Sequence, residues 1–125
     1  MQYQNKKQKN NNMNKICTSL EQSKKLIMLG IGVNTADMVY IPFANNPQEY
    51  DCVINVWNNE HVKDWFPAWS LSALMTLLDD KAGLAKEYGL WFCYDNGKSH
   101  CTKHYETQID AAFEMVCWLL ENKKL

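Results

Sequence analysis

The sequence predicts an α+β domain in which a small antiparallel sheet is covered by helices. The first observation is helical periodicity with capping residues in three segments, near 19–29, 71–78 and 108–122. The second is a set of segments rich in β-branched or alternating apolar residues, at 38–41, 50–57 and 90–104. Helices near both ends of a chain, with strands between them, are typical of an antiparallel sheet packed on one side.

The length and composition fit one globular domain with a polar N-terminal tail. The chain has 125 residues, of which 46% are hydrophobic and 12% aromatic. Residues 1–15 are almost all Gln, Asn and Lys, which bury too little apolar surface to offset the entropy of ordering them. We therefore expect a disordered polar tail over 1–15 and a single α+β domain over 16–125.

Charge and cysteine usage limit the partners and the compartment. The formal net charge of −1 gives no electrostatic reason to expect duplex nucleic acid or an anionic membrane as partner. All 13 basic residues are lysine, so an anionic ligand would be held by backbone N–H groups, lysines and hydroxyls, although a coding bias explains the same composition. Five cysteines at unpaired spacings indicate reduced thiols in a cytoplasm. No run of about 18 apolar residues predicts a membrane span.

The first helix has a start signal and a stop signal. Thr18 and Glu21 have the spacing of a capping box, which makes Thr18 the expected N-cap. The helix should continue to about Leu29. Gly30 follows it and suits the left-handed backbone position that ends many helices.

Two strands are expected in the next part of the chain. The apolar run 38–41 predicts the first strand, which Pro42 and the cluster 45–47 should end. The β-branched segment 50–57 predicts the second strand. These strands precede the middle helix in the predicted order of elements.

The middle helix has one apolar stripe. Leu71, Leu74, Met75 and Leu78 recur at helical spacing, and Ser70 is the expected N-cap. The residues that follow, 81–88, are predicted to form a short helical turn ended by Gly89.

The pair Asn96-Gly97 predicts a β-hairpin over residues 90–104. Asn-Gly suits the positive φ angles of a type I′ turn, which would place Asp95 opposite Lys98, Cys93 opposite His100 and Trp91 opposite Thr102. The other face of the hairpin would then carry three residues, Phe92, Tyr94 and Cys101.

The last helix should cover residues 108–122. Thr107 and Asp110 have capping-box spacing at its start. Its predicted buried face is an apolar stripe made of Ile109, Ala112, Phe113, Val116 and Leu120.

Three tryptophans within thirteen residues, Trp57, Trp65 and Trp69, form the candidate ligand site. Trp69 lies beside the expected helix start at Ser70, so that flat aromatic surface is next to free backbone N–H groups. Lys63 would add a positive charge. This combination suits a planar anionic ligand such as a nucleotide, whereas the simpler interpretation is that the tryptophans belong to the core.

The hairpin offers a second, weaker candidate site. Its expected register places Cys93, His100 and His104 on one face, where they could bind Zn²⁺ or form a thiolate–imidazole pair. Tight Cys-x-x-Cys spacing is missing, and the sequence shows no third orienting group. An ordinary half-buried strand pair is therefore favoured, and we predict no metal site, no cofactor and no catalytic residue.

Three blocks of the chain, Ile16 to Met38, Pro67 to Leu78 and Asp110 to Leu125, cover about two fifths of it. Together they resemble segments of a family of short uncharacterised proteins from gut bacteria and their phages. The resemblance implies an origin in a phage or mobile element and a place in the host cell cytoplasm. It implies no catalytic residue.

The leading hypothesis from the sequence is a noncatalytic protein that sequesters a nucleotide-like signal of host antiviral defence. Its proposed ligand residues are Trp57, Lys63, Trp65, Trp69 and Ser70. The alternative is a protein–protein inhibitor or assembly module that presents a Trp-rich surface to a host or phage protein. A homo-oligomer suits both hypotheses. The third is a hydrolase that uses Cys93, His100 and His104.

Overall fold

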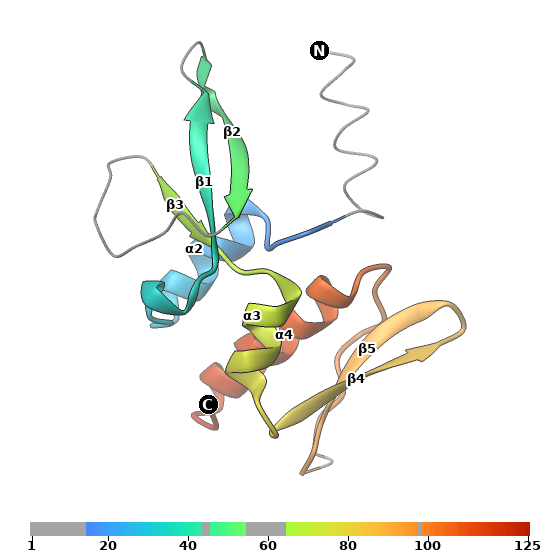
Figure 1. Cartoon of the computed structure of the whole chain (residues 1–125). Coiled ribbons are helices and arrows are strands. Elements are labelled where there is room, and N and C mark those ends of the chain that lie inside the picture. Colours follow the sequence, from blue (N-terminus) through green and yellow to red (C-terminus); the bar gives the residue numbers. More distant parts are fainter. Residues whose placement is uncertain (1–14, 44–45, 55–64, 98) are drawn as a thin grey trace.

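The computed structural model confirms the α+β class (Figure 1). It describes residues 15–43, 46–54, 65–97 and 99–125. The described helices are α2 (Leu20–Met28), α3 (Leu71–Leu78) and α4 (Gln108–Glu121), with a 3₁₀ turn at Val33–Thr35. The strands are β1 (Met38–Phe43), β2 (Asn46–Ile54), β3 (Phe66–Ala68), β4 (Ala82–Glu87) and β5 (Leu90–Asp95). None of these helices is both long and apolar enough to cross a bilayer.

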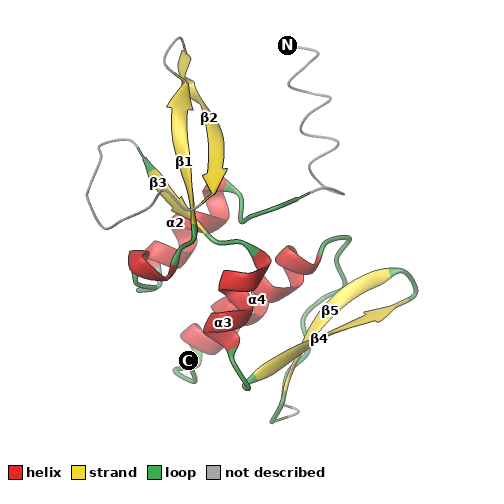
Figure 2. Cartoon of the chain, in the orientation of Figure 1, coloured by secondary structure: helices red, strands yellow, loops and turns green. Residues whose placement is uncertain are grey.

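The strands form two separate antiparallel sheets (Figure 2). The first has the order β2-β1-β3, and α2 packs beside β3. The second is the hairpin β4-β5, whose inner side packs on α4. Helices α3 and α4 pack on each other and lie between the two sheets. The main core cluster combines the helices and Trp69 with residues of the β4-β5 hairpin, and a second, smaller cluster of Cys17, Met38 and Ala68 lies at the first sheet.

The core is built mainly from one face of each helix and from Trp69. Its largest fully buried side chains include Trp69, Leu26, Leu74, Leu78 and Met115. Each such aliphatic side chain contributes about 1.5–3 kcal/mol through removal of its surface from water. The buried face of α4 differs in part from the prediction. Ile109, Ala112 and Val116 are buried as predicted, whereas Phe113 and Leu120 are only partly buried. The other buried residues of α4 are Ala111, Met115, Cys117 and Leu119.

The start of α2 lies one residue later than predicted. Ser19, not Thr18, is the N-cap: its hydroxyl accepts from the N–H of Gln22 at 3.1 Å, and the Gln22 side chain accepts from the Ser19 N–H at 2.9 Å. Thr18 is fully buried, and its hydroxyl accepts from the Trp69 N–H at 3.1 Å. A tertiary contact thus uses the hydroxyl that local spacing assigned to the cap. The predicted stop at Gly30 is confirmed, with φ +98°.

The prediction that Pro42 ends the first strand is wrong. β1 continues to Phe43, with Pro42 opposite Tyr50, and β2 begins at Asn46 rather than at Tyr50. Among the described residues, β3 pairs with β1 only as far as Tyr40, so the pairing described at Pro42 is with β2 alone. A strand tolerates proline where its missing N–H is not needed for the ladder.

The predicted helical turn over 81–88 is a strand, β4. Glu87 and Leu90 pair across a two-residue loop, Tyr88-Gly89, whose φ angles are +54° and +79°. Positive φ at both central positions defines a type I′ turn. Pairing with β5 therefore overrides the modest helical preference of the local sequence.

The chain does reverse after β5, but the predicted hairpin register is wrong. The described part of the return segment forms two isolated bridges with β5, Trp91 with Tyr105 and Tyr94 with Cys101. Gly97 does not adopt the left-handed backbone. Instead the Asp95 carboxylate accepts from the Gly97 N–H at 2.8 Å and from the Ser99 hydroxyl, which makes the loop wider than two residues.

The middle and last helices match their predictions closely. α3 has the predicted bounds and its Ser70 hydroxyl accepts from the Ala73 N–H. α4 begins after Thr107, whose hydroxyl accepts from the Asp110 N–H. The start of the domain differs slightly, because Lys15, the last residue of the predicted tail, is anchored to Asp110.

Candidate functional site

The predicted tryptophan site is divided between core and loop. Trp69 is 0% exposed, and its indole N–H donates to the Thr35 hydroxyl at 2.9 Å. A ring in that position has no free face on which a ligand could stack. Trp65 is half-buried, and Trp57 and Lys63 lie outside the described residues. The structure therefore does not bring the five predicted ligand residues together as one described surface.

The sequence predicted that the N-terminus of α3 could bind an anionic ligand. In the structure, a carboxylate of the same chain already lies beside it. Asp37 accepts from the Ser70 N–H at 2.9 Å, and its second oxygen accepts from the Ser70 hydroxyl. A negative charge at this position is stabilised by the helix dipole. An external anion would therefore have to compete with Asp37 for the same donors.

The predicted grouping of Cys93, His100 and His104 is wrong. Cys93 is fully buried, and burial raises the pKa of its thiol to about 12, which opposes thiolate formation. His100 stacks on Trp118, with ring centroids 4.3 Å apart. His104 packs against Phe92, on the opposite side of β5 from Cys93. The described residues contain no group of three His, Cys, Asp or Glu side chains that could hold a metal ion.

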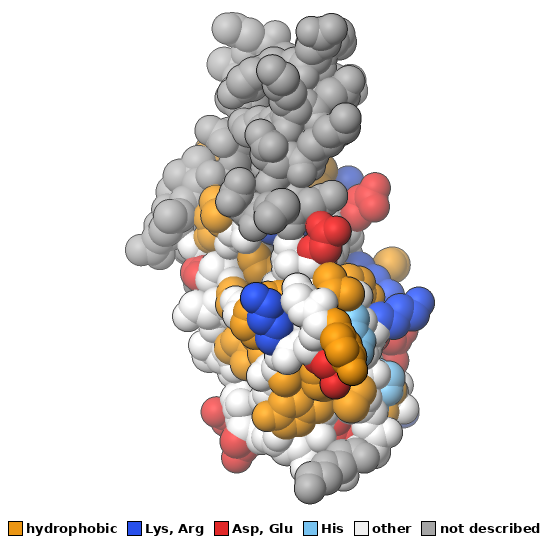
Figure 3. Space-filling model, turned by 90° about the vertical axis from the view of Figure 1, so that its right-hand side faces the viewer, with side chains coloured by type: hydrophobic (Ala, Val, Ile, Leu, Met, Phe, Trp, Pro, Cys, Tyr) orange, Lys and Arg blue, Asp and Glu red, His pale blue; other side chains and the backbone are white. Residues whose placement is uncertain are grey.

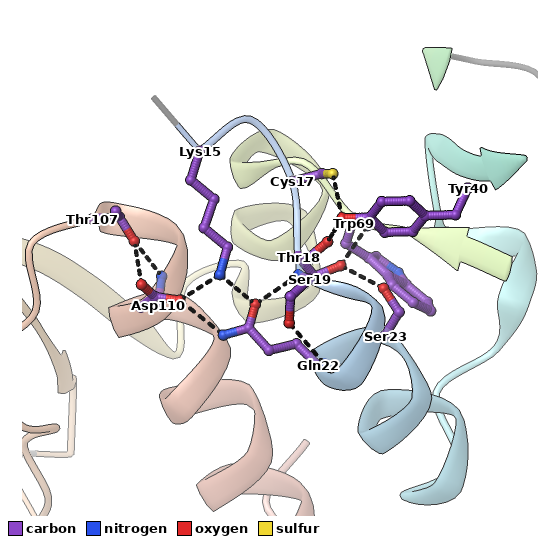
Figure 4. Close-up of polar contacts among 10 residues, drawn as sticks. All are labelled: Lys15, Cys17, Thr18, Ser19, Gln22, Ser23, Tyr40, Trp69, Thr107 and Asp110. Atoms are coloured by element: carbon purple, nitrogen blue, oxygen red, sulfur yellow. Dashed lines mark hydrogen bonds and ion pairs between the residues drawn. The ribbon is translucent and has the colours of Figure 1, made fainter. Parts of the chain in front are cut away.

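Asp110 is the centre of a polar cluster whose contacts with Lys15 and Gln22 were not predicted from the sequence (Figure 4). Its carboxylate accepts from Lys15 and Gln22, both at 2.8 Å, and from the Thr107 hydroxyl at 2.7 Å. Burial opposes ionisation, but these hydrogen bonds outweigh it, so the pKa of Asp110 lies below its ordinary value. The cluster ties the start of α2 to the start of α4, which is a structural role.

A second polar cluster fixes the segment before α2 to β1 and β3 (Figure 4). The Thr18 N–H donates to the Trp69 carbonyl at 2.9 Å, and the Thr18 and Ser23 hydroxyls lie 2.8 Å apart. The Tyr40 hydroxyl donates to the Thr18 carbonyl at 2.7 Å. Since Thr18 and Ser23 are fully buried, these bonds satisfy groups that would otherwise be costly to desolvate.

The outer face of the β4-β5 hairpin carries two aromatic side chains of β5, the exposed Tyr94 and the partly buried Phe92. Along β5 the inward residues Cys93 and Asp95 alternate with the outward residues Phe92 and Tyr94. Tyr94 is 38% exposed and its ring lies over Gly83, where an added Cβ would be 2.7 Å from the hydroxyl. We call Gly83, Ala85, Phe92, Tyr94 and His104 the aromatic face.

Charged groups border the aromatic face. The His104 ring lies 4.8 Å from the Phe92 ring, and its Nε2 lies 3.0 Å from a carboxylate oxygen of Glu87. The His104 and Glu87 side chains are 39% and 53% exposed, so this contact contributes little to stability. Figure 3 views the molecule from the side of β4 and β5 and shows hydrophobic surface there with charged side chains and histidine around it.

A signal for this face was present in the sequence. The alternation along residues 90–95 predicted that Phe92, Tyr94 and Cys101 share a side of the hairpin, and the bridge between Tyr94 and Cys101 agrees with that grouping. The clustering of Trp57, Trp65 and Trp69 nevertheless predicted a binding site at the tryptophans. Alternation shows which side chains share a face, but only the position of α4 shows which face is covered.

Comparison with models of protein families, with curated protein sequences and with solved structures finds no match to this chain. The resemblance of its three helical blocks to proteins of gut bacteria and their phages therefore stays a prediction. Function has to be inferred from the geometry of the chain itself.

Proposed function

We propose that this protein is a noncatalytic binding protein that holds another polypeptide chain on its aromatic face. The observation that supports this most directly is the position of Phe92 and Tyr94 on the side of β5 turned away from α4. Among the described elements, no helix covers that side (Figure 1). The same strand buries Cys93 completely on its other side, so only the outer face remains available.

A protein partner fits this face better than a small planar ligand. Small-molecule sites are usually concave and bury most of the ligand. Here the Tyr94 ring itself fills the space above Gly83. A tyrosine presents a large apolar ring with a hydroxyl that can form a hydrogen bond, and this combination is common at the centre of protein interfaces.

The hypothesis of nucleotide sequestration would depend on fewer residues than the sequence suggested. Trp69 is buried, and Ser70 is bound to Asp37. Trp57, Lys63 and Trp65 would have to form the site without them. If the predicted phage origin is correct, the polypeptide partner that we propose is a protein of the host cell.

Site-specific photo-crosslinking tests the proposal. A photoreactive phenylalanine analogue at position 94 should form a discrete crosslinked product with a partner protein in producing cells. The matched control is the same analogue at Tyr88, which is 95% exposed at the tip of the hairpin but outside the aromatic face. Equal crosslinking at both positions, or no product at position 94, would contradict the proposal.

Thermal denaturation with a panel of nucleotides tests the small-ligand hypothesis. Stabilisation by about 2.7 kcal/mol at a hundredfold excess over Kd is the expected result for a sequestering protein. If that stabilisation were seen in the wild type and in Tyr94→Ser alike, the ligand would bind away from the aromatic face, and nucleotide sequestration would replace our proposal.

A further inference from the structure

The outer edge of β4 has no neighbour in the part of the chain that the structure describes. β5 pairs with β4 on one side and forms its isolated bridges with the return segment on the other. Among the described strands, β4 is therefore the edge strand of this sheet, and none of them pairs with its far side. An open edge presents unpaired N–H and C=O groups that can pair with a further strand.

The hydrogen-bond pattern identifies the residues whose backbone groups face this open edge. Trp91 exchanges hydrogen bonds with Tyr105 on the return segment, and the Cys93 carbonyl accepts from Thr102, so these two β5 residues bond away from β4. The alternate residues Phe92 and Tyr94 therefore bond toward β4, in agreement with the hydrogen bond from the Asn96 N–H to the Lys81 carbonyl. Antiparallel pairs alternate in this way. The groups facing the open edge are therefore those of Ala82, Leu84 and Lys86.

We infer that a second copy of this chain pairs with the open edge of β4 in antiparallel orientation, with Leu84 opposite Leu84 of the partner subunit. The inference rests on the proposed function, since it enlarges the same aromatic face. Pairing across a two-fold axis gives the sheet order β5-β4-β4-β5 and satisfies the edge groups of both copies.

Charge complementarity selects this register. With Leu84 at the centre, Lys81 lies opposite Glu87 of the partner subunit, and the symmetry creates this pair twice. Both side chains are exposed. Lys81 directly precedes β4, and the hydrogen bond from the Asn96 N–H to the Lys81 carbonyl continues the β4-β5 ladder by one residue, so we place Lys81 on the same side of the sheet as Glu87. Opposite charges directly across an antiparallel pair are favourable.

The neighbouring registers lack this match. A shift by two residues in one direction places Glu87 opposite Asp79 of the partner subunit, and this like-charge contact offsets the attraction between Lys86 and Asp80 of the partner subunit in the same register. A shift in the other direction places Lys81 opposite Gly89 of the partner subunit and removes both ion pairs. The side chains thus favour one pairing among those that the backbone allows.

The two-fold axis would run perpendicular to the sheet, so both aromatic faces would lie on the same side. Phe92 and Tyr94 of the two copies would lie on this side at the two outer strands, with Gly83 and Ala85 of both β4 strands between them. α4 packs mainly against β5 and on the inner side, so it leaves the edge of β4 accessible.

Sedimentation velocity of the full chain, from about 10 μM to about 1 mM, tests the inference over the range in which weak contacts are populated. The wild type should show a concentration-dependent dimer. Lys81→Glu and Glu87→Lys should each weaken dimerisation by roughly tenfold, because each change creates two like-charge pairs. The double variant Lys81→Glu/Glu87→Lys restores the opposite charges and should recover the dimer.

Backbone hydrogen exchange provides a residue-specific measurement that needs no substitution. The amides of Ala82, Leu84 and Lys86 should become protected as the protein concentration rises. The amides of Ala85 and Glu87 bond to β5 within one chain and should show the same protection at all concentrations.

Three outcomes would overturn the inference: a wild type that stays monomeric at about 1 mM, a dimer that both single charge reversals leave unchanged, or amides at Ala82, Leu84 and Lys86 whose exchange does not depend on concentration. Dimerisation and partner binding can fail separately. A monomer that still crosslinks through position 94 would overturn the edge pairing and leave the proposed function intact. A dimer that does not crosslink to a partner protein would overturn the proposed function and leave the edge pairing intact.

Discussion

Trp69 and Tyr94 are both large aromatic residues, yet the fold uses them in opposite ways. Trp69 follows β3 directly and is fully buried, with its indole N–H bound to Thr35. Tyr94 lies on β5 with its ring turned away from the helices and remains 38% exposed. The difference shows that aromatic content alone does not locate a binding surface. The position of each side chain relative to α3 and α4 decides its role.

The strongest test of this difference is truncation of each ring. Trp69→Ala should lower the free energy of unfolding by about 3–5 kcal/mol, because it leaves a cavity in the core. Tyr94→Ala should cost about 1 kcal/mol or less, since much of that ring is already in water. Urea unfolding of both variants measures the contrast. Similar losses in the two variants would show that the rings are not used differently.

Removal of the hydroxyl that hydrogen-bonds to the Trp69 N–H should lower the free energy of unfolding by a smaller amount. Thr18→Val keeps the shape of the side chain but removes the hydroxyl that accepts from the Trp69 N–H and bonds to Ser23. We expect a loss of about 1–3 kcal/mol in urea unfolding, because two buried polar groups lose a partner. Thr76→Val, on the exposed side of α3, is the matched control and should change stability little. An unchanged free energy in Thr18→Val would show that the cluster is not needed for the fold.

The lowered pKa of Asp110 predicts that the free energy of unfolding depends on pH. The pKa of Asp110 is lowered in the folded state, so its contribution is present above the ordinary carboxyl pKa and is lost as pH falls through the folded value. Asp110→Asn should therefore be less stable at neutral pH and should lose less stability between about pH 5 and pH 3 than the wild type. Unfolding curves across that range measure it. Parallel curves for the two proteins would contradict the lowered pKa.

The smallest expected effect concerns the tip of the exposed hairpin. Tyr88 has φ +54° in the type I′ turn, a position that asparagine occupies more easily. Tyr88→Asn should stabilise the protein by about 0.5–1 kcal/mol and leave crosslinking from position 94 unchanged. The melting temperature and the crosslinking yield check both parts. Lower stability would mean that the Tyr88 ring has a role beyond the turn.

Local patterns in the sequence determined the helices and the fold class. The stripe of Leu71, Leu74, Met75 and Leu78 with Ser70 as N-cap predicted the bounds of α3, because periodicity and capping act within a few residues. Gly30 and Thr107 marked helix ends for the same reason.

Contacts between distant segments decided the rest. β4 is a strand because β5 pairs with it. Ser70 is bound by Asp37, which lies 33 residues earlier in the chain. α3, α4 and the segment before α2 bury Trp69. Because Trp69 is buried, the candidate binding surface is the one that carries Phe92 and Tyr94. Sequence periodicity identifies the residues that share a face, but it carries no information about which face another element will cover. Only the tertiary structure settles that, because burial depends on neighbours that the chain supplies from elsewhere.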